Sequence, residues 1–174
     1  MLLVRIAMSA QKPLHIFFDA EGTLYQVRKG KTSEDFWDNG EKTVKRAMEY
    51  FELDPGAPAL LQALKKQGHR LHILSRNVEN VLHPLVSHFD VRRYFDSVVI
   101  KNDKAKYLIE FKNREGLRKE HIVMVGDTWN LDVVPVGRRG FRALLLDRDS
   151  KSDAPNRISD IREVLQLSDG TGER

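Results

Sequence analysis

The fold of this chain is decided by the stretch Leu14-His-Ile-Phe-Phe-Asp-Ala-Glu-Gly-Thr-Leu-Tyr25. Its first half is a short apolar run, which is typical of a strand buried on both faces of a parallel sheet. The run stops at Asp19, and Gly22 lies three residues further on, where the chain must turn. In open α/β sheets ligands bind at the carboxyl ends of the strands, so we expect Asp19 to lie where chemistry takes place.

The composition is that of a globular protein with one domain, expected to span residues 1–174. The chain has 41% hydrophobic and 31% charged residues, and its length suffices for one core. It has no cysteine, which excludes disulfides and thiolate metal sites. No apolar run approaches the ~20 residues of a membrane span. The mildly apolar start from Met1 to Met8 is too short for a signal peptide, so we expect a cytoplasmic protein with no membrane partner.

The charge of the chain favours an anionic ligand. The formal net charge is +4, which suits an anionic substrate. The basic residues are scattered along the sequence, and no aromatic stacking platform accompanies them. The sequence therefore gives no indication of nucleic-acid binding.

Strands alternate with helices along the chain, which predicts βαβ units and a parallel sheet with helices on both faces. After the first strand, Lys29-Gly30 is expected to turn a small hairpin. Residues 33–51 are expected to be helical, as one or two helices, with Ser33 as a possible N-cap. Further strands are expected at 70–75, 97–100, 121–125 and 141–146. Further helices are expected at 57–67, 77–88, 104–114 with Asp103 as N-cap, before Gly140 with Pro135 in the first turn, and at 158–167.

The string Asp19-Ala-Glu-Gly-Thr-Leu24 resembles the nucleophile motif of the haloacid dehalogenase (HAD) superfamily, usually written Asp-x-Asp-Gly-Thr-Leu. It departs at one position, where Glu21 stands in place of the usual Asp. The resemblance covers about residues 12–167. It implies a three-layer α/β/α, Rossmann-like fold with strand order 5-4-1-2-3, and a minimal cap insertion at about 25–53.

Ser75 ends the second predicted parallel strand and matches the family's second motif, which binds the transferred phosphoryl group. A small hydroxyl can hydrogen-bond a phosphate oxygen without blocking access. The backbone N–H groups of Arg76 and Asn77 lie beside the start of the next helix, which is a natural anion site. Taken alone, the serine also fits a simple N-cap.

The family places a lysine at the start of the helix before the fourth strand, where it neutralises the phosphate and the nucleophile. Lys101, Lys104 and Lys106 all compete for this role. Lys104 best matches members that read Lys-Ala before an apolar helix, and Lys101 fits another type of member almost as well. A cation in a first helical turn opposes the helix dipole by about 0.3–1 kcal/mol, so Lys104 is easier to explain if it faces a bound anion.

The stretch Val125-Gly-Asp-Thr-Trp-Asn-Leu-Asp132 resembles the family's Gly-Asp-x-x-x-x-Asp motif. Asp127 leaves the end of an apolar strand, as Asp19 does, and two carboxylates from adjacent strand ends make a hard oxygen site that suits Mg²⁺. The resemblance adds the backbone carbonyl of Glu21 as a ligand. Asp132 is expected to support the metal from behind its ligands or through water, or to cap the following helix.

The implied reaction is phosphoryl transfer to Asp19 and hydrolysis of the aspartyl phosphate by an Mg²⁺-dependent phosphatase. The residue two places after the nucleophile protonates the leaving group and then activates water, and here it is Glu21. The reference pKa of Glu is close to that of Asp, ~4.3 against ~3.9, but Glu reaches one methylene further. We therefore expect Glu21→Asp to match or exceed the parent in activity.

Dehalogenases of the family carry a bulky apolar or aromatic residue at that position and a large cap. Here the position is acidic and the insertion short, which leaves the site open to a bulky phosphorylated substrate or to a partner protein. The lid residues expected near the site are Arg28, Lys29, Lys31 and Trp37. The alternative is a catalytically weak or inactive module that binds a phosphorylated ligand or a protein partner, and Glu21 is the residue that favours it.

Overall fold

The computed structural model describes residues 13–169 of the chain. Parallel strands form a six-stranded sheet in the order β5-β4-β1-β6-β7-β8. All five strands that the sequence predicted are present, which confirms the α/β fold. When these five are numbered in chain order, the sheet read from β7 to β5 has the predicted order 5-4-1-2-3. The strands are β1 (His15–Phe18), β4 (Arg70–Ser75), β5 (Ser97–Ile100), β6 (Ile122–Gly126), β7 (Arg142–Leu146) and β8 (Arg157–Ile158).

The sixth strand, β8, replaces the start of a predicted helix. Arg157 and Ile158 pair with the end of β7, and a 3₁₀-helix, η4 (Ile161–Asp169), follows. The prediction of a helix from Ile158 to Leu167 was wrong at its start. Two residues that extend the edge of an existing sheet leave no periodic signal, because their pairing depends on β7.

Alternate residues of β1 face opposite layers of the molecule. Ile16 and Phe18 belong to an apolar cluster with α3 (Ala57–Lys66), α4 (Glu79–His88) and η4. Phe17 belongs to a second cluster with α5 (Lys104–Arg114) and α6 (Val134–Arg138). All three side chains are fully buried. The sheet therefore lies between two helical layers, as the period of a buried strand requires.

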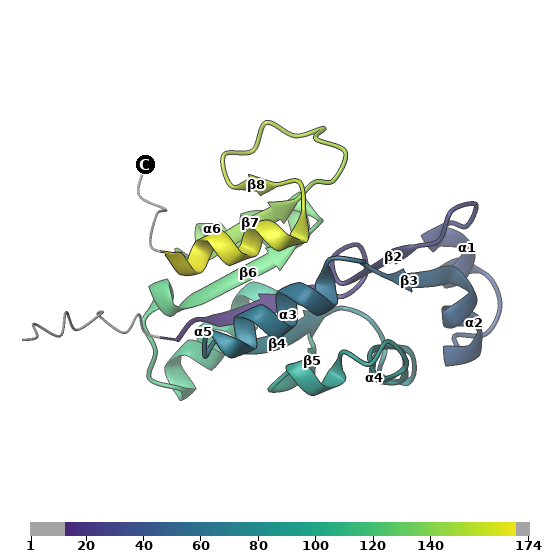
Figure 1. The fold of residues 1–174 in the computed structure, drawn as a ribbon, viewed down its shortest axis with the longest axis horizontal. Coiled ribbons are helices and arrows are strands. Elements are labelled where there is room, and N and C mark those ends of the chain that lie inside the picture. Colours follow the sequence, from purple (N-terminus) through teal and green to yellow (C-terminus); the bar gives the residue numbers. More distant parts are fainter. Residues whose placement is uncertain (1–12, 170–174) are drawn as a thin grey trace, which may run out of the picture.

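A small insertion lies beyond the end of the sheet at which β1 stops (Figure 1). Its strands β2 (Tyr25–Val27) and β3 (Phe51–Leu53) form an antiparallel pair, and α1 (Ser33–Asp38) and α2 (Val44–Tyr50) lie between them in sequence. β2 therefore pairs with β3, and not across Lys29-Gly30 as the sequence suggested.

The helical segment expected over 33–51 forms two helices, α1 and α2. Thr32, not Ser33, caps α1 by accepting from the N–H of Asp35, and Thr43 caps α2. Gly40 between them has a φ of +66°, which interrupts the helix at low cost. Phe51 leaves the helical pattern because it pairs with Val27 in the antiparallel ribbon.

The remaining connections contain short helical segments. Asp103 caps α5 as expected, by accepting from the N–H of Lys106 at 2.9 Å. The segment before Gly140 starts as a π-helix, η3, and continues as α6 with Pro135 in its first turn. The π-helix η3 covers Trp129–Val133, and the remaining short segments are η1 (Arg92–Tyr94) and η2 (Lys119–His121).

No helix among residues 13–169 combines the length and the apolar character needed to cross a membrane. The start from Met1 to Met8, expected to be too short for a signal peptide, lies outside the described residues. So do both ends of the predicted domain of residues 1–174.

Candidate active site

Asp19 follows β1 directly, and the backbone there stays bonded to the sheet. Its N–H donates to the carbonyl of Val125 in β6 at 2.9 Å, and the N–H of Ala20 donates to the Asp19 carboxylate at 2.8 Å. The chain then turns at Gly22, whose φ of +78° favours glycine. A Cβ there would lie 2.1 Å from a carboxylate oxygen of Asp127, so this glycine lets the two strand ends approach.

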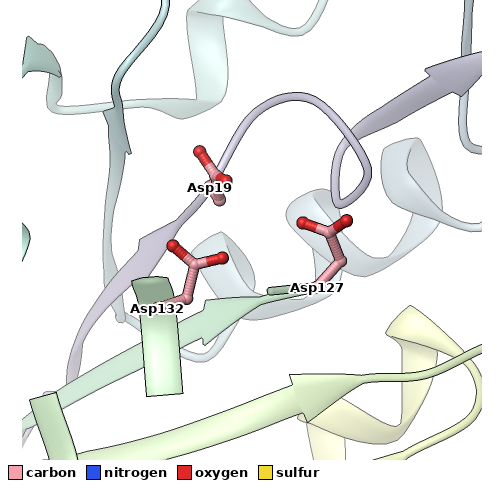
Figure 2. Close-up of side chains that lie close together, drawn as sticks. All are labelled: Asp19, Asp127 and Asp132. Atoms are coloured by element: carbon pink, nitrogen blue, oxygen red, sulfur yellow. The ribbon is translucent and has the colours of Figure 1, made fainter. Parts of the chain in front are cut away.

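Three carboxylates gather beside this turn (Figure 2). Asp19 follows β1, Asp127 follows β6, and Asp132 lies in η3. One oxygen of each lies within 4.8 Å of the others. A Cβ at Gly126 would lie 2.4 Å from the Cβ of Asp132, so a second glycine makes room for the third carboxylate.

Lys104, the first residue of α5, is the cation of this cluster. Its Nζ lies 2.9 Å from Oδ1 of Asp19 and 2.6 Å from Oδ1 of Asp132, and the residue is only 2% exposed. The second oxygen of Asp132 accepts from the N–H of Thr128 at 3.1 Å. Of the three competing lysines, Lys101 and Lys106 are exposed to solvent. Only Lys104 reaches the carboxylates.

The cluster holds more negative than positive charge. Burial, with the charges of Asp19 and Asp132, raises the pKa of Asp127 to about 6. Burial also raises the pKa of Asp19, against the pull of Lys104. Three carboxylates facing one ammonium leave room for a divalent cation, and an all-oxygen donor set suits Mg²⁺. Asp19 and Asp127 offer carboxylate oxygens to such a cation, while Asp132 holds Lys104.

Ser75 closes the opposite side of the site at the end of β4. It is buried, and its hydroxyl oxygen accepts from the N–H of Asn77 at 3.2 Å. The side chain of Asn77 donates to the hydroxyl of Tyr25 at 2.8 Å and accepts from the N–H of Val78 at 2.7 Å. Asn77 therefore fixes Ser75 and the start of the insertion, while Arg76 is exposed beside them.

An open cavity of about 660 Å³ joins the strand ends to the insertion. An adjoining cavity of about 710 Å³ shares Gly22, Gln26, Val27 and Asp127 with it and extends toward the loop after β7. Lys104 and Asp132 lie behind the surface that solvent reaches. The predicted site residues that line the first cavity are Asp19, Glu21, Ser75, Arg76, Asn77 and Asp127.

Glu21 lies between the core and the insertion. Both of its carboxylate oxygens accept hydrogen bonds from α1: Oε1 from the hydroxyl of Ser33, and Oε2 from the indole N–H of Trp37 at 2.9 Å. Burial raises the pKa of Glu21, and these two hydrogen bonds oppose the rise. The sequence placed Trp37 near the site but gave no sign that Ser33 or Trp37 would bind Glu21.

A family model described as haloacid dehalogenase-like hydrolase matches residues 31–135. The chain belongs to this family. No curated protein matches the sequence of this HAD-like hydrolase.

Solved structures share the fold of this HAD-like hydrolase at low sequence identity. A HAD phosphatase from Thermococcus onnurineus is 16% identical with a TM-score of 0.72, over 88% of this chain and 97% of that one. The HAD-hydrolase YfnB from Bacillus subtilis, bound to magnesium, is 13% identical with a TM-score of 0.68, over 91% and 99%. A predicted phosphoglycolate phosphatase from Haemophilus somnus 129PT is 18% identical with a TM-score of 0.66, over 92% and 99%.

Most of the basic lid residues of this HAD-like hydrolase turn away from the cavities. Arg28 pairs with Glu52 at 3.2 Å on the exposed side of the insertion, and the Nζ of Lys31 lies 4.8 Å from the ring centre of Tyr50. Lys29 is exposed. Of the four lid residues expected near the site, Trp37 is the one that lines the first cavity.

Arg148, in the loop after β7, is a residue that the sequence did not single out. Its guanidinium donates to the carbonyl of Thr23 at 2.9 Å, to the carbonyl of Gly22, and to the carboxylate of Asp54 at 2.6 Å. These partners lie where the chain enters and leaves the insertion. Arg148 therefore fixes the base of the insertion to the core of this HAD-like hydrolase.

Proposed function

We propose that this hydrolase is an Mg²⁺-dependent phosphatase that acts on phosphomonoesters through an aspartyl phosphate on Asp19. The observation that carries the proposal is the contact of Lys104 with Asp19 and Asp132 beside a third carboxylate, Asp127, at the floor of an open cavity. Such a cluster presents a nucleophile, an anion-neutralising cation and a magnesium site together.

The reaction takes two steps. A carboxylate oxygen of Asp19 attacks phosphorus, the bond from phosphorus to the leaving oxygen breaks, and Glu21 donates a proton to that oxygen. Glu21 then takes a proton from water as the water oxygen attacks phosphorus, which releases inorganic phosphate and restores Asp19. Ser75 binds a phosphate oxygen, and Lys104 offsets negative charge at Asp19 from behind the cavity surface. Mg²⁺, when bound, offsets the charge of the phosphate beside the nucleophile.

The two cavities indicate the size of the substrate. They meet at Gly22, Gln26, Val27 and Asp127, and together they exceed what a phosphate group fills. The insertion contributes two short helices and a two-stranded ribbon. We infer a phosphorylated substrate with a bulky leaving group.

One observation favours a second candidate function, a module with little activity that binds a phosphorylated ligand or a protein partner. Both oxygens of Glu21 already accept hydrogen bonds from Ser33 and Trp37, which competes with proton transfer to a substrate. Halide displacement is less well supported, because the floor of the cavity gathers carboxylates that call for a metal ion.

The deciding experiment is hydrolysis of p-nitrophenyl phosphate with Mg²⁺. We expect turnover that EDTA abolishes and Mg²⁺ restores, and a loss of at least about 10³-fold in Asp19→Asn. Asp90→Asn, a change on the exposed surface, is the matched control. Phosphate binding by calorimetry without turnover on a panel of phosphorylated metabolites and peptides would support the binding module. Halide release from a 2-haloacid without phosphate release would replace the phosphatase with a dehalogenase.

A further inference from the structure

The contact between Glu21 and α1 joins two parts of the molecule that are fixed separately. Glu21 belongs to the turn after β1, where the N–H of Gly22 donates to the carbonyl of Tyr25 at 2.7 Å. Ser33 and Trp37 belong to the insertion. The hydroxyl of Ser33 and the indole N–H of Trp37 each donate a hydrogen bond to one carboxylate oxygen of Glu21.

The donors are held in place by the packing of the insertion. The ring of Phe36, fully buried, lies 5.0 Å from the ring of Phe51 and 4.7 Å from the ring of Trp37. Arg46 of α2 donates to the carbonyl of Phe36 at 2.8 Å and to that of Asp35 at 2.6 Å, which ties the two helices together. A shift of the insertion would therefore move both donors away from Glu21 together.

The chemistry of the two donors differs. An indole N–H only donates, so Oε2 of Glu21 must remain an acceptor in this contact. A hydroxyl both donates and accepts, so Ser33 can stay bonded to Oε1 whether or not that oxygen carries a proton. The two donors therefore fix the orientation of the whole carboxylate, with one oxygen held by each.

We propose that Ser33 and Trp37 are positioning residues that hold the Glu21 carboxylate in its working orientation, so that the placement of the insertion sets the geometry of the acid and base. The inference rests on the proposed phosphatase function for its catalytic part. It also explains the departure from the family motif, since an aspartate would be one methylene too short to keep both contacts. The proposal therefore predicts the opposite of the sequence-based expectation for Glu21→Asp, namely a loss of activity.

The contact itself is tested without any activity measurement. Hydrogen exchange of residues 33–38 should be faster in Glu21→Ala and in Glu21→Asp than in the parent, because α1 loses its attachment to the core. Glu49→Ala, an exposed change on α2, is the matched control and should leave this exchange unchanged. Equal exchange in the parent and both Glu21 variants would overturn the proposal.

The catalytic part is tested by kinetics on phenyl phosphate, whose leaving group needs a proton. Trp37→Phe and Ser33→Ala should lower kcat by about 10–100-fold and change KM little, because a misplaced carboxylate slows the chemical step. In a Glu21→Ala background, Trp37→Phe should cost nothing further. Tyr94→Phe, which removes a hydroxyl from a ring outside the insertion, is the matched aromatic control.

Three results would overturn the positioning role: a kcat of Glu21→Asp equal to or above that of the parent, an additive loss when Trp37→Phe is combined with Glu21→Ala, or a rise in KM alone. If the parent protein shows no turnover, the proposed phosphatase function is wrong, and so is the positioning role in catalysis. Faster exchange in the Glu21 variants would then still support the contact, so the two failures are distinguishable.

Discussion

Asp96 and Asp127 lie at opposite ends of the sheet, Asp96 just before β5 and Asp127 just after β6. Asp96 accepts from Lys65 at 2.9 Å, from Arg70 at 3.0 Å and from the N–H of Leu71 at 2.9 Å. Burial alone would raise the pKa of Asp96, but these hydrogen bonds outweigh it and lower the pKa to about 2.

Asp127 has the opposite surroundings. Burial and the charges of Asp19 and Asp132 raise its pKa to about 6. At the Asp96 end of the sheet, hydrogen bonds to the carboxylate therefore stabilise the fold. At the Asp127 end, the crowded carboxylates destabilise the fold until a cation binds. Raised carboxylate pKa values beside a cavity are typical of functional sites, so the comparison favours the Asp127 end of the sheet without reference to any motif.

The largest effect expected from this contrast concerns Lys104. Lys104→Met should lower the free energy of unfolding by about 3–5 kcal/mol in EDTA, because it leaves Asp19 and Asp132 buried without their cation. Urea unfolding measures the change, and Lys106→Met, on the exposed side of α5, is the control. A loss below about 1 kcal/mol would show that the cluster does not depend on this ammonium group.

The next effect is that of the metal. Mg²⁺ at 100 times its Kd should raise the free energy of unfolding of the parent by about 2.7 kcal/mol. Asp127→Asn should gain nothing from Mg²⁺. In EDTA at pH 7 this variant should be more stable than the parent by about 1–2 kcal/mol, because the ionised Asp127 opposes folding.

The sign follows from the raised pKa of Asp127. Its pKa in the folded protein, about 6, lies above the ordinary value of 3.8, so the folded state binds the proton more tightly. The advantage of Asp127→Asn should therefore shrink as the pH falls from 7 to 4. Thermal unfolding over this pH range checks it, and an equal Mg²⁺ gain in the variant would reject the metal site.

The smallest effect belongs to the satisfied end of the sheet. Asp96→Asn should lower the free energy of unfolding by about 1 kcal/mol at pH 7, a figure reduced for screening by solvent. Because the pKa of Asp96 is lowered to about 2 from 3.8, this stability is present above pH 4 and lost as the pH falls toward 2. Asp90→Asn, the same substitution at an exposed carboxylate, is the control.

The sequence predicted which residues lie together at one edge of the sheet, because parallel strands bring their carboxyl ends to the same edge. Asp19, Ser75 and Asp127 each end a strand, and Lys104 starts a helix, so their local signals carried the spatial information. Among the lysines, the choice needed the structure, since burial separates Lys104 from its neighbours.

Contacts that depend on long-range packing left no such signal. Glu21 meets Ser33 and Trp37 only because β2 and β3 pair and carry α1 back over the strand ends. β3 itself was hidden in an apolar pattern that also fits a helix, and its pairing with β2 decided between the two. The partner of Arg148, Asp54, lies 94 residues away in sequence, which no local pattern can reveal.

The contacts of Arg148 with the base of the insertion can form only late in the synthesis of the chain. β1 emerges from the ribosome early, but its neighbour β6 and the residue that fastens the insertion emerge late. Until Arg148 is synthesised, the ribbon of β2 and β3 lacks the hydrogen bonds that the guanidinium makes to the carbonyls of Gly22 and Thr23 and to Asp54. A chain that stops before Ile122 therefore carries Asp19 but lacks β6, Asp127 and Asp132, so it cannot assemble the carboxylate cluster.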